Sequence, residues 1–131
     1  MANISTEGLD YMPDAKNQLR EESIDFAIHV SDICDEIKGC PIYVNQLLRC
    51  SSSIGANIHE AKYAQSRADF IHKLEIALKE SSETDYWLEL LFRKGRLSDR
   101  QYTMLKNQCG MIRRKLIASV TTAKANSQKI D

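Results

Sequence analysis

Residues 66–95, with the sequence SRADFIHKLEIALKESSETDYWLELLFRKG, decide the fold. Apolar side chains recur there at steps of three and four residues, which places them on one face of a helix. Ser66 with Asp69 three residues later is typical of a helix N-cap, and Gly95 is typical of a helix end. The predicted core face consists of Phe70, Ile71, Leu74, Ala77, Leu78, Ser81, Leu88 and Phe92.

Three further segments outside this stretch show the same periodicity. Gly39 and Pro41 separate the first two, and a capping box of Ser98 and Gln101 opens the last. Four long amphipathic helices with short links predict an all-α, antiparallel up-down-up-down four-helix bundle. The predicted helices cover 16–38, 41 to 63–66, 66–95 and 98 to about 125. We expect a flexible arm over 1–15, the bundle over 16–125 and a flexible tail over 126–131.

Charge is distributed unevenly along the chain. The 131 residues carry 18 Lys+Arg and 18 Asp+Glu, so the net charge is zero. Residues 1–38 hold 3 basic and 9 acidic side chains, whereas residues 100–131 hold 7 basic and 1 acidic. This asymmetry indicates either pairing between the first and last helices or a charged partner. A composition of 43% hydrophobic and 27% charged residues excludes disordered and low-complexity classes.

The sequence predicts a cytoplasmic protein without a membrane partner. No segment approaches the roughly 18–20 apolar residues of a membrane span. Residues 1–13 have neither the basic start nor the apolar run of a secretory signal. The four cysteines form no Cys-x-x-Cys pair, so we expect small buried side chains in a reducing compartment rather than disulfides. They are Cys34, Cys40, Cys50 and Cys109.

Motifs for catalysis are absent from the sequence. It has no P-loop, no glycine-rich dinucleotide turn and no Gly-x-Ser-x-Gly elbow. A di-metal site in a bundle needs two Glu-x-x-His motifs, and the nearest match, Asp69-x-x-His72, occurs once. The run from Ser51 to Ala56 lies within a helix, where small residues favour close packing over a phosphate site. We therefore predict no enzymatic activity, no metal and no cofactor.

Two surfaces are candidates for binding. Ile76, Trp87 and Leu90, with Tyr86 beside them, form a second apolar stripe opposite the core face of the third helix. This stripe favours a contact with another subunit, although scattered surface hydrophobes are common. The last helix carries cations that fit nucleic-acid phosphates, but they also fit pairing with the first helix or plain solvation. These cations are Arg100, Lys106, Arg113, Arg114, Lys115 and Lys124.

The second and third predicted helices resemble a known family. The chain is similar there to the small four-helix-bundle proteins encoded in intervening sequences of bacterial 23S ribosomal RNA genes, and the likeness covers about residues 17–120. Cys50-Ser51-Ser52 stands where a Ser-Gly-Thr-like run is usual, and the N-terminal arm is longer than typical. The matching residues are Gln46-Leu47-Leu48-Arg49, Ser53-Ile54-Gly55-Ala56-Asn57-Ile58, Glu60-Ala61, Ser66, Asp69-Phe70-Ile71, Lys73-Leu74, Ile76-Ala77-Leu78-Lys79-Glu80, Glu83 and Tyr86-Trp87-Leu88.

The resemblance implies a cytoplasmic bacterial protein that assembles as a ring-shaped homopentamer. Related bundles act as accessory factors that bind nucleic acid and reverse transcriptase in diversity-generating retroelements through basic surfaces. The family has no associated catalytic residues, so the resemblance implies none here. We hypothesise a polar network that fixes the register of neighbouring subunits, with Trp87 as its apolar anchor. The candidate interface residues are Ser53, Asn57, Glu60, Ile76, Glu80, Glu83, Tyr86, Trp87 and Leu90.

The leading functional hypothesis is a non-enzymatic homo-oligomer that binds RNA or DNA, or a ribonucleoprotein partner, through the basic last helix. Stacked subunits would join their basic segments into one surface, which allows a neutral chain to bind nucleic acid. The first alternative is an adaptor that binds only protein, such as a reverse transcriptase. The second is an enzyme or metal protein with its site in the bundle interior. The sequence leaves the nucleic acid and the protein partner open.

Overall fold

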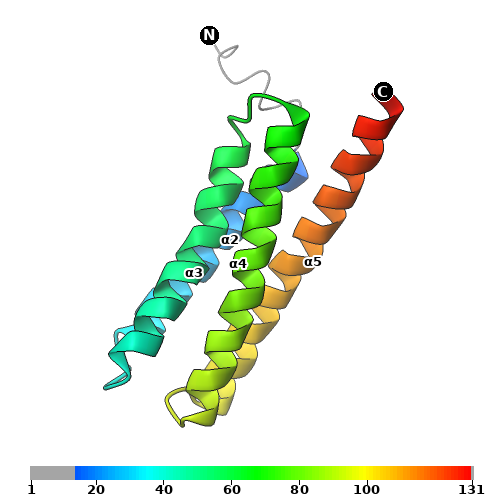
Figure 1. Cartoon of the computed structure of the whole chain (residues 1–131). Coiled ribbons are helices and arrows are strands. Elements are labelled where there is room, and N and C mark those ends of the chain that lie inside the picture. Colours follow the sequence, from blue (N-terminus) through cyan, green and yellow to red (C-terminus); the bar gives the residue numbers. More distant parts are fainter. Residues whose placement is uncertain (1–13, 131) are drawn as a thin grey trace.

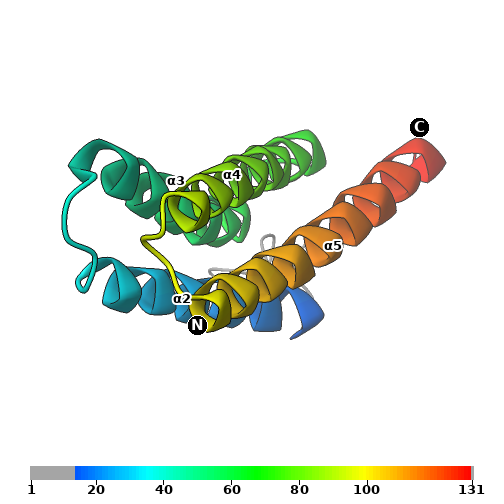
Figure 2. The same ribbon diagram turned by 90° about the horizontal axis from the view of Figure 1, so that it is seen from below.

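The computed structural model describes residues 14–130 and shows four helices, with no strand among these residues. Figure 1 shows the helices running alternately up and down. Figure 2 shows α3 and α4 side by side above α2 and the first half of α5, in agreement with their contacts. The predicted all-α four-helix bundle is confirmed. The helices are α2 (Asp14–Cys34), α3 (Pro41–Ala61), α4 (Arg67–Arg93) and α5 (Asp99–Ile130).

The predicted caps are present at the starts of α4 and α5. The Ser66 hydroxyl accepts a hydrogen bond from the Asp69 backbone N–H at 3.1 Å. Ser98 accepts from the Gln101 N–H at 3.0 Å, and the Gln101 side chain accepts from the Ser98 N–H at 3.0 Å. Gly95 follows α4 with a φ of +76°, which glycine adopts without strain. Each cap satisfies N–H groups that an isolated helix leaves unpaired.

Two helix ends lie earlier than predicted. α2 ends at Cys34 rather than at 38, because the N–H groups of Glu36 and Ile37 bond three residues back and tighten the chain out of the helix. Gly39 and Cys40 then both adopt left-handed backbone conformations, with φ of +82° and +55°, immediately before Pro41. The right-handed helical region is disfavoured before proline, so the chain reverses direction here. α3 ends at Ala61 through similar tightening.

The C-terminal boundary is later than predicted. α5 continues to Ile130, so the expected start of a tail at residue 126 is wrong as a helix boundary. Neither glycine nor proline follows Gly110, so nothing in the sequence breaks the helix there. Figures 1 and 2 show the C-terminal end of α5 standing away from the other helices. At the other end α2 already includes Asp14 and Ala15, and residues 1–13 of the expected arm lie outside the described residues.

The core is formed by the predicted apolar stripes of all four helices. Phe26, Leu47 and Leu88 are completely buried. Cys34, Cys50 and Cys109 are also buried, as predicted, and all four cysteines are free thiols. Tight packing of such side chains stabilises the bundle. Removing apolar surface from water contributes roughly 25 cal/mol of free energy per Å².

Five hydroxyl side chains are buried within this core. Each donates its hydrogen bond to a backbone carbonyl three or four residues earlier in its own helix. This arrangement satisfies the hydroxyl without any partner from a neighbouring helix. The five residues are Ser23, Ser51, Ser81, Thr84 and Ser119.

Candidate nucleic-acid and subunit-contact surfaces

Three of the six predicted phosphate-binding cations on α5 form ion pairs within the chain. The Arg113 guanidinium lies 2.8 Å from an Asp85 carboxylate oxygen of α4. The side chains of Arg113 and Asp85 are about three-quarters buried. Two further ion pairs of α5 cations are more exposed. The other two pairs are Lys115 with Glu22 at 2.7 Å and Lys124 with Glu75 at 2.9 Å.

The remaining three cations form no ion pair with the described side chains, so their charge is available to a ligand. Lys106 donates to the Tyr102 hydroxyl at 3.3 Å, and this hydrogen bond raises the pKa of the lysine. Tyr102 in turn stacks on Phe92 with ring centroids 4.2 Å apart. Arg100 and Arg114 are exposed, and no carboxylate within residues 17–127 pairs with either. Free cations are therefore present on α5, but they are fewer than the sequence suggested.

The partners of the paired cations clarify the charge asymmetry. Lys115 reaches the acidic α2 through Glu22, as one sequence interpretation expected. Arg113 and Lys124 instead reach acidic residues of α4. Much of the acidic charge of α2 stays unneutralised: Asp25 and Asp32 are exposed and have no cationic partner among the described side chains.

Several candidate interface residues of α3 and α4 form polar contacts within the chain itself, and the predicted network between subunits stays a prediction. Arg49 of α3 bridges Glu80 at 3.3 Å and Glu83 of α4. The Trp87 indole N–H donates to Glu83 at 3.1 Å. Hydrogen bonds from Arg49 and then from Trp87 lower the pKa of Glu83. The Trp87 ring also stacks on Tyr43 of α3, with centroids 5.8 Å apart.

Some of the other candidate interface residues form bonds within the chain, and others are partly exposed. Asn57 donates to the Ser53 hydroxyl at 3.1 Å, and Glu60 pairs with Lys73 at 2.8 Å. Ile76 and Leu90 are half-buried. The structure thus connects these polar groups inside the subunit. Their role toward another copy stays a prediction.

Sequence reasoning missed an exposed apolar pair on α2. Ile24 and Ile28 lie one turn apart and are 37% and 51% exposed. The spacing of two isoleucines at i and i+4 among acidic residues was the available signal. Beside them, the seam between α2 and α5 is hollowed. Its lining consists of Glu22, Asp25, His29, Gln108, Met111 and Ile112.

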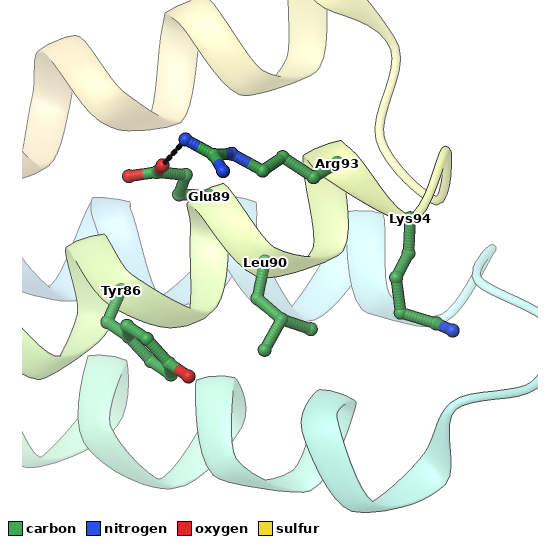
Figure 3. A pocket seen from close by; sticks show the side chains of 5 residues that line it. All are labelled: Tyr86, Glu89, Leu90, Arg93 and Lys94. Atoms are coloured by element: carbon green, nitrogen blue, oxygen red, sulfur yellow. Dashed lines mark ion pairs between the residues drawn. The ribbon is translucent and has the colours of Figure 1, made fainter.

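A second hollow lies on the outer face of α4. Its lining includes two cations that are not among the predicted phosphate contacts. Figure 3 shows Tyr86, Leu90 and Lys94 projecting towards α3, and Glu89 and Arg93 projecting from the other side of α4. Arg93 pairs with Glu89 at 2.5 Å. Both Arg93 and Lys94 lie outside the last helix, which holds all six predicted phosphate-binding cations.

Two further features of the described residues concern metal ligands and membrane-spanning helices. Among their side chains, no group of three or more His, Cys, Asp or Glu comes together to hold a metal ion. The Asp69 carboxylate accepts from the Gln65 N–H at 3.1 Å, so it contributes to the start of α4. No helix in this part of the chain has the length and apolar character needed to cross a bilayer.

Comparisons with known proteins agree with this architecture. Residues 15–118 match the family described as 23S rRNA-intervening sequence protein. The chain belongs to that family. A crystal structure of a protein of unknown function from the S23 ribosomal protein family of Bacteroides thetaiotaomicron superposes with a TM-score of 0.77 at 41% identity. The match covers 81% of this chain and 97% of the other. No curated protein matches the chain. The 23S rRNA-intervening sequence protein family thus accounts for nearly the whole bundle, as the resemblance implied.

Proposed function

We propose that the protein is a non-enzymatic homo-oligomer that binds RNA through α5. The resemblance implies five subunits. The observation that carries the RNA-binding proposal is the exposure of Arg100 and Arg114, which have no carboxylate partner among the described side chains. Cations without an internal partner attract phosphate without first breaking an ion pair. Arg113, Lys115 and Lys124 contribute less, because phosphate would have to displace Asp85, Glu22 or Glu75 from them.

Oligomerisation strengthens this proposal. A single α5 presents few free cations, so a monomer would bind phosphate weakly. Several copies arranged around one assembly bring their α5 helices together and multiply the local positive potential. The exposed pair Ile24 and Ile28 supplies apolar surface for the subunit contact, because the polar members of the α4 stripe already bond within the subunit.

Fluorescence anisotropy with a labelled structured RNA tests the nucleic-acid proposal. Replacing Arg100 and Arg114 by Gln should weaken binding about tenfold or more and lower the salt slope by about two, since two phosphate contacts are lost. The matched control replaces Lys62 and Lys79 by Gln, which removes the same charge elsewhere, and should change affinity less than about twofold. Absence of binding by the wild type at low salt would refute the proposal.

The molar mass in solution tests the oligomer. Light scattering should give a multiple of the 14.9 kDa chain. Ile24→Glu with Ile28→Glu should shift the mass towards the monomer, because a charge cannot be buried unpaired at a subunit contact. Trp87→Ala on α4 and Glu60→Ala on α3 test the other candidate interface residues in the same way. A wild type that remains monomeric at high concentration contradicts the proposal.

The second candidate function is a protein-binding adaptor. The hollowed seam between α2 and α5 favours it, because Met111 and Ile112 provide an apolar lining beside Asp25. Such a mixed groove suits a partner segment with apolar and basic side chains. Pull-down with and without nuclease separates the two candidates, since an adaptor retains its partner after the nucleic acid is digested.

A further inference from the structure

The outer hollow of α4 combines an aromatic ring with cations. Tyr86 is 59% exposed, and Leu90 and Lys94 follow it at successive turns on the same side of the helix (Figure 3). Arg93 projects from the other side of α4 (Figure 3), where it is paired with Glu89 at 2.5 Å. An exposed ring next to an aliphatic side chain and an ammonium group, with no ion pair to that ammonium among the described side chains, has the composition of a platform for a planar ligand that carries negative charge.

The ring of Trp87 holds the Tyr86 ring in position. The ring contacts Trp87 with centroids 4.9 Å apart and planes at 78°. Trp87 is itself fixed by its hydrogen bond to Glu83 and by stacking on Tyr43. A ring held by a rigid neighbour loses little conformational entropy when a ligand stacks on it.

Further cations lie at the same end of the bundle. The link between α4 and α5 carries Arg96, whose guanidinium donates to the Cys40 sulfur at 3.5 Å. This contact joins the link to the α2–α3 connection, and Figure 1 shows both connections at one end of the bundle. Arg100 follows in the first turn of α5 and is exposed. Lys94 lines the Tyr86 hollow, and Arg96 and Arg100 follow it in the chain at this end of the bundle.

We propose that this end of the bundle binds single-stranded nucleic acid. One base stacks on Tyr86 against Leu90, and the adjoining phosphates follow Lys94, Arg96 and Arg100. Bases in a duplex are already stacked on one another, whereas a single strand presents its bases to an aromatic ring. The inference rests on the proposed nucleic-acid function and adds the type of strand and the place where its base is held.

The test compares a labelled 12-nucleotide RNA as a single strand and as a duplex with its complement. The wild type should bind the single strand more tightly than the duplex. Tyr86→Ala should weaken single-strand binding about fivefold or more and leave duplex binding unchanged, because stacking contributes only where a base is free. Tyr86→Phe should restore affinity, since the ring is retained. Tyr63→Ala, which removes a tyrosine of similar exposure (54%) from elsewhere, is the matched control and should have no effect.

The outcomes separate this inference from the proposed function. If the wild type binds neither RNA, both proposals are wrong. If Arg100→Gln with Arg114→Gln weakens binding while Tyr86→Ala does not, only the stacking site is wrong. Preference for the duplex also overturns the inference. The same holds if Tyr86→Ala lowers the molar mass, because Tyr86 is then part of a subunit contact.

Discussion

The hydroxyl of Ser23 in α2 occupies the space next to Gly55 of α3. A Cβ placed on Gly55 would come within 3.0 Å of the Ser23 Oγ and 3.5 Å of its Cβ. The hydroxyl is held in place by its 2.7 Å hydrogen bond to the Arg20 carbonyl. The absence of a side chain at Gly55 thus sets how closely α2 and α3 approach.

This contact predicts a dependence on background for Gly55→Ala. In the wild type the substitution should lower the free energy of unfolding by about 1 kcal/mol, because crowding against the hydroxyl exceeds the gain in helix propensity of about 1 kcal/mol. In a Ser23→Ala background the hydroxyl is gone, so the same substitution should stabilise the protein. Urea denaturation of the four proteins measures this coupling. Equal effects in both backgrounds would show that the hydroxyl does not limit the approach.

The pair of Arg113 and Asp85 should be a structural contact. One oxygen of Asp85 is buried and has no hydrogen-bond partner among the described residues. Arg113 therefore compensates the negative charge of this carboxylate. Arg113→Met should lower the free energy of unfolding by about 2 kcal/mol, and Asp85→Ala combined with Arg113→Met should recover part of this loss.

Arg93→Met is the matched control, because its pair with Glu89 is much more exposed. We expect a loss below about 1 kcal/mol for that variant. Thermal or urea unfolding of the set decides the prediction, and equal losses for Arg113→Met and Arg93→Met would contradict it.

The bridge from Arg49 to Glu83 predicts a pH dependence. The pKa of Glu83 is lowered below its ordinary value of 4.5, chiefly by the hydrogen bond from Arg49. A carboxyl with a lowered pKa in the folded state contributes stability above its unfolded pKa and loses it as the pH falls through the folded pKa.

Arg49→Gln should therefore reduce the loss of stability on acidification below pH 4.5. The change should stay below about 1 kcal/mol, because both side chains are more than one-third exposed and solvent screens the pair. Urea denaturation at neutral and acid pH measures it. A variant with the same acid dependence as the wild type would argue against the bridge.

The thiols should differ in reactivity. Burial raises the pKa of Cys109 to about 12 and that of Cys34 to about 11, so both stay protonated near neutral pH. Cys50 is buried as well, whereas Cys40 is half-buried. Brief alkylation of the folded protein should therefore modify Cys40 first, and unfolding should expose all four. Peptide mass spectrometry reads the order, and early labelling of Cys109 would contradict the burial argument.

Signals that act over a few residues were predictable from the sequence. The caps at Ser66 and Ser98 depend on hydrogen bonds within three residues, so local spacing was enough. The left-handed backbone of Gly95 was predictable for the same reason. The two left-handed residues before Pro41 were only half predicted, because nothing in a cysteine side chain indicates such a conformation for Cys40.

The sequence predicts less about which side chains of different helices pair with one another. Spacings of seven and eleven residues place Lys106, Arg113 and Lys124 on one flank of the last helix. Its periodicity cannot decide whether that flank meets α2 or α4, because the direction of the turns between the helices determines the neighbour. The structure turns Arg113 and Lys124 towards α4. The proposed nucleic-acid site combines the exposed ring of Tyr86 with cations of the α4–α5 link, and helical periodicity does not predict how that link runs.

The buried hydroxyls have a consequence for transient opening of the protein. The hydroxyls of Ser51, Ser81 and Ser119 keep their hydrogen bonds when their helices separate, because each acceptor belongs to the same helix. Brief separation of two helices therefore loses apolar contacts but strands none of these polar groups. We expect the cost of small sliding or parting of helix pairs to come from lost apolar contacts alone, with no added cost from these hydroxyls. Such motion would let the helices of a newly synthesised chain adjust to one another while the bundle packs.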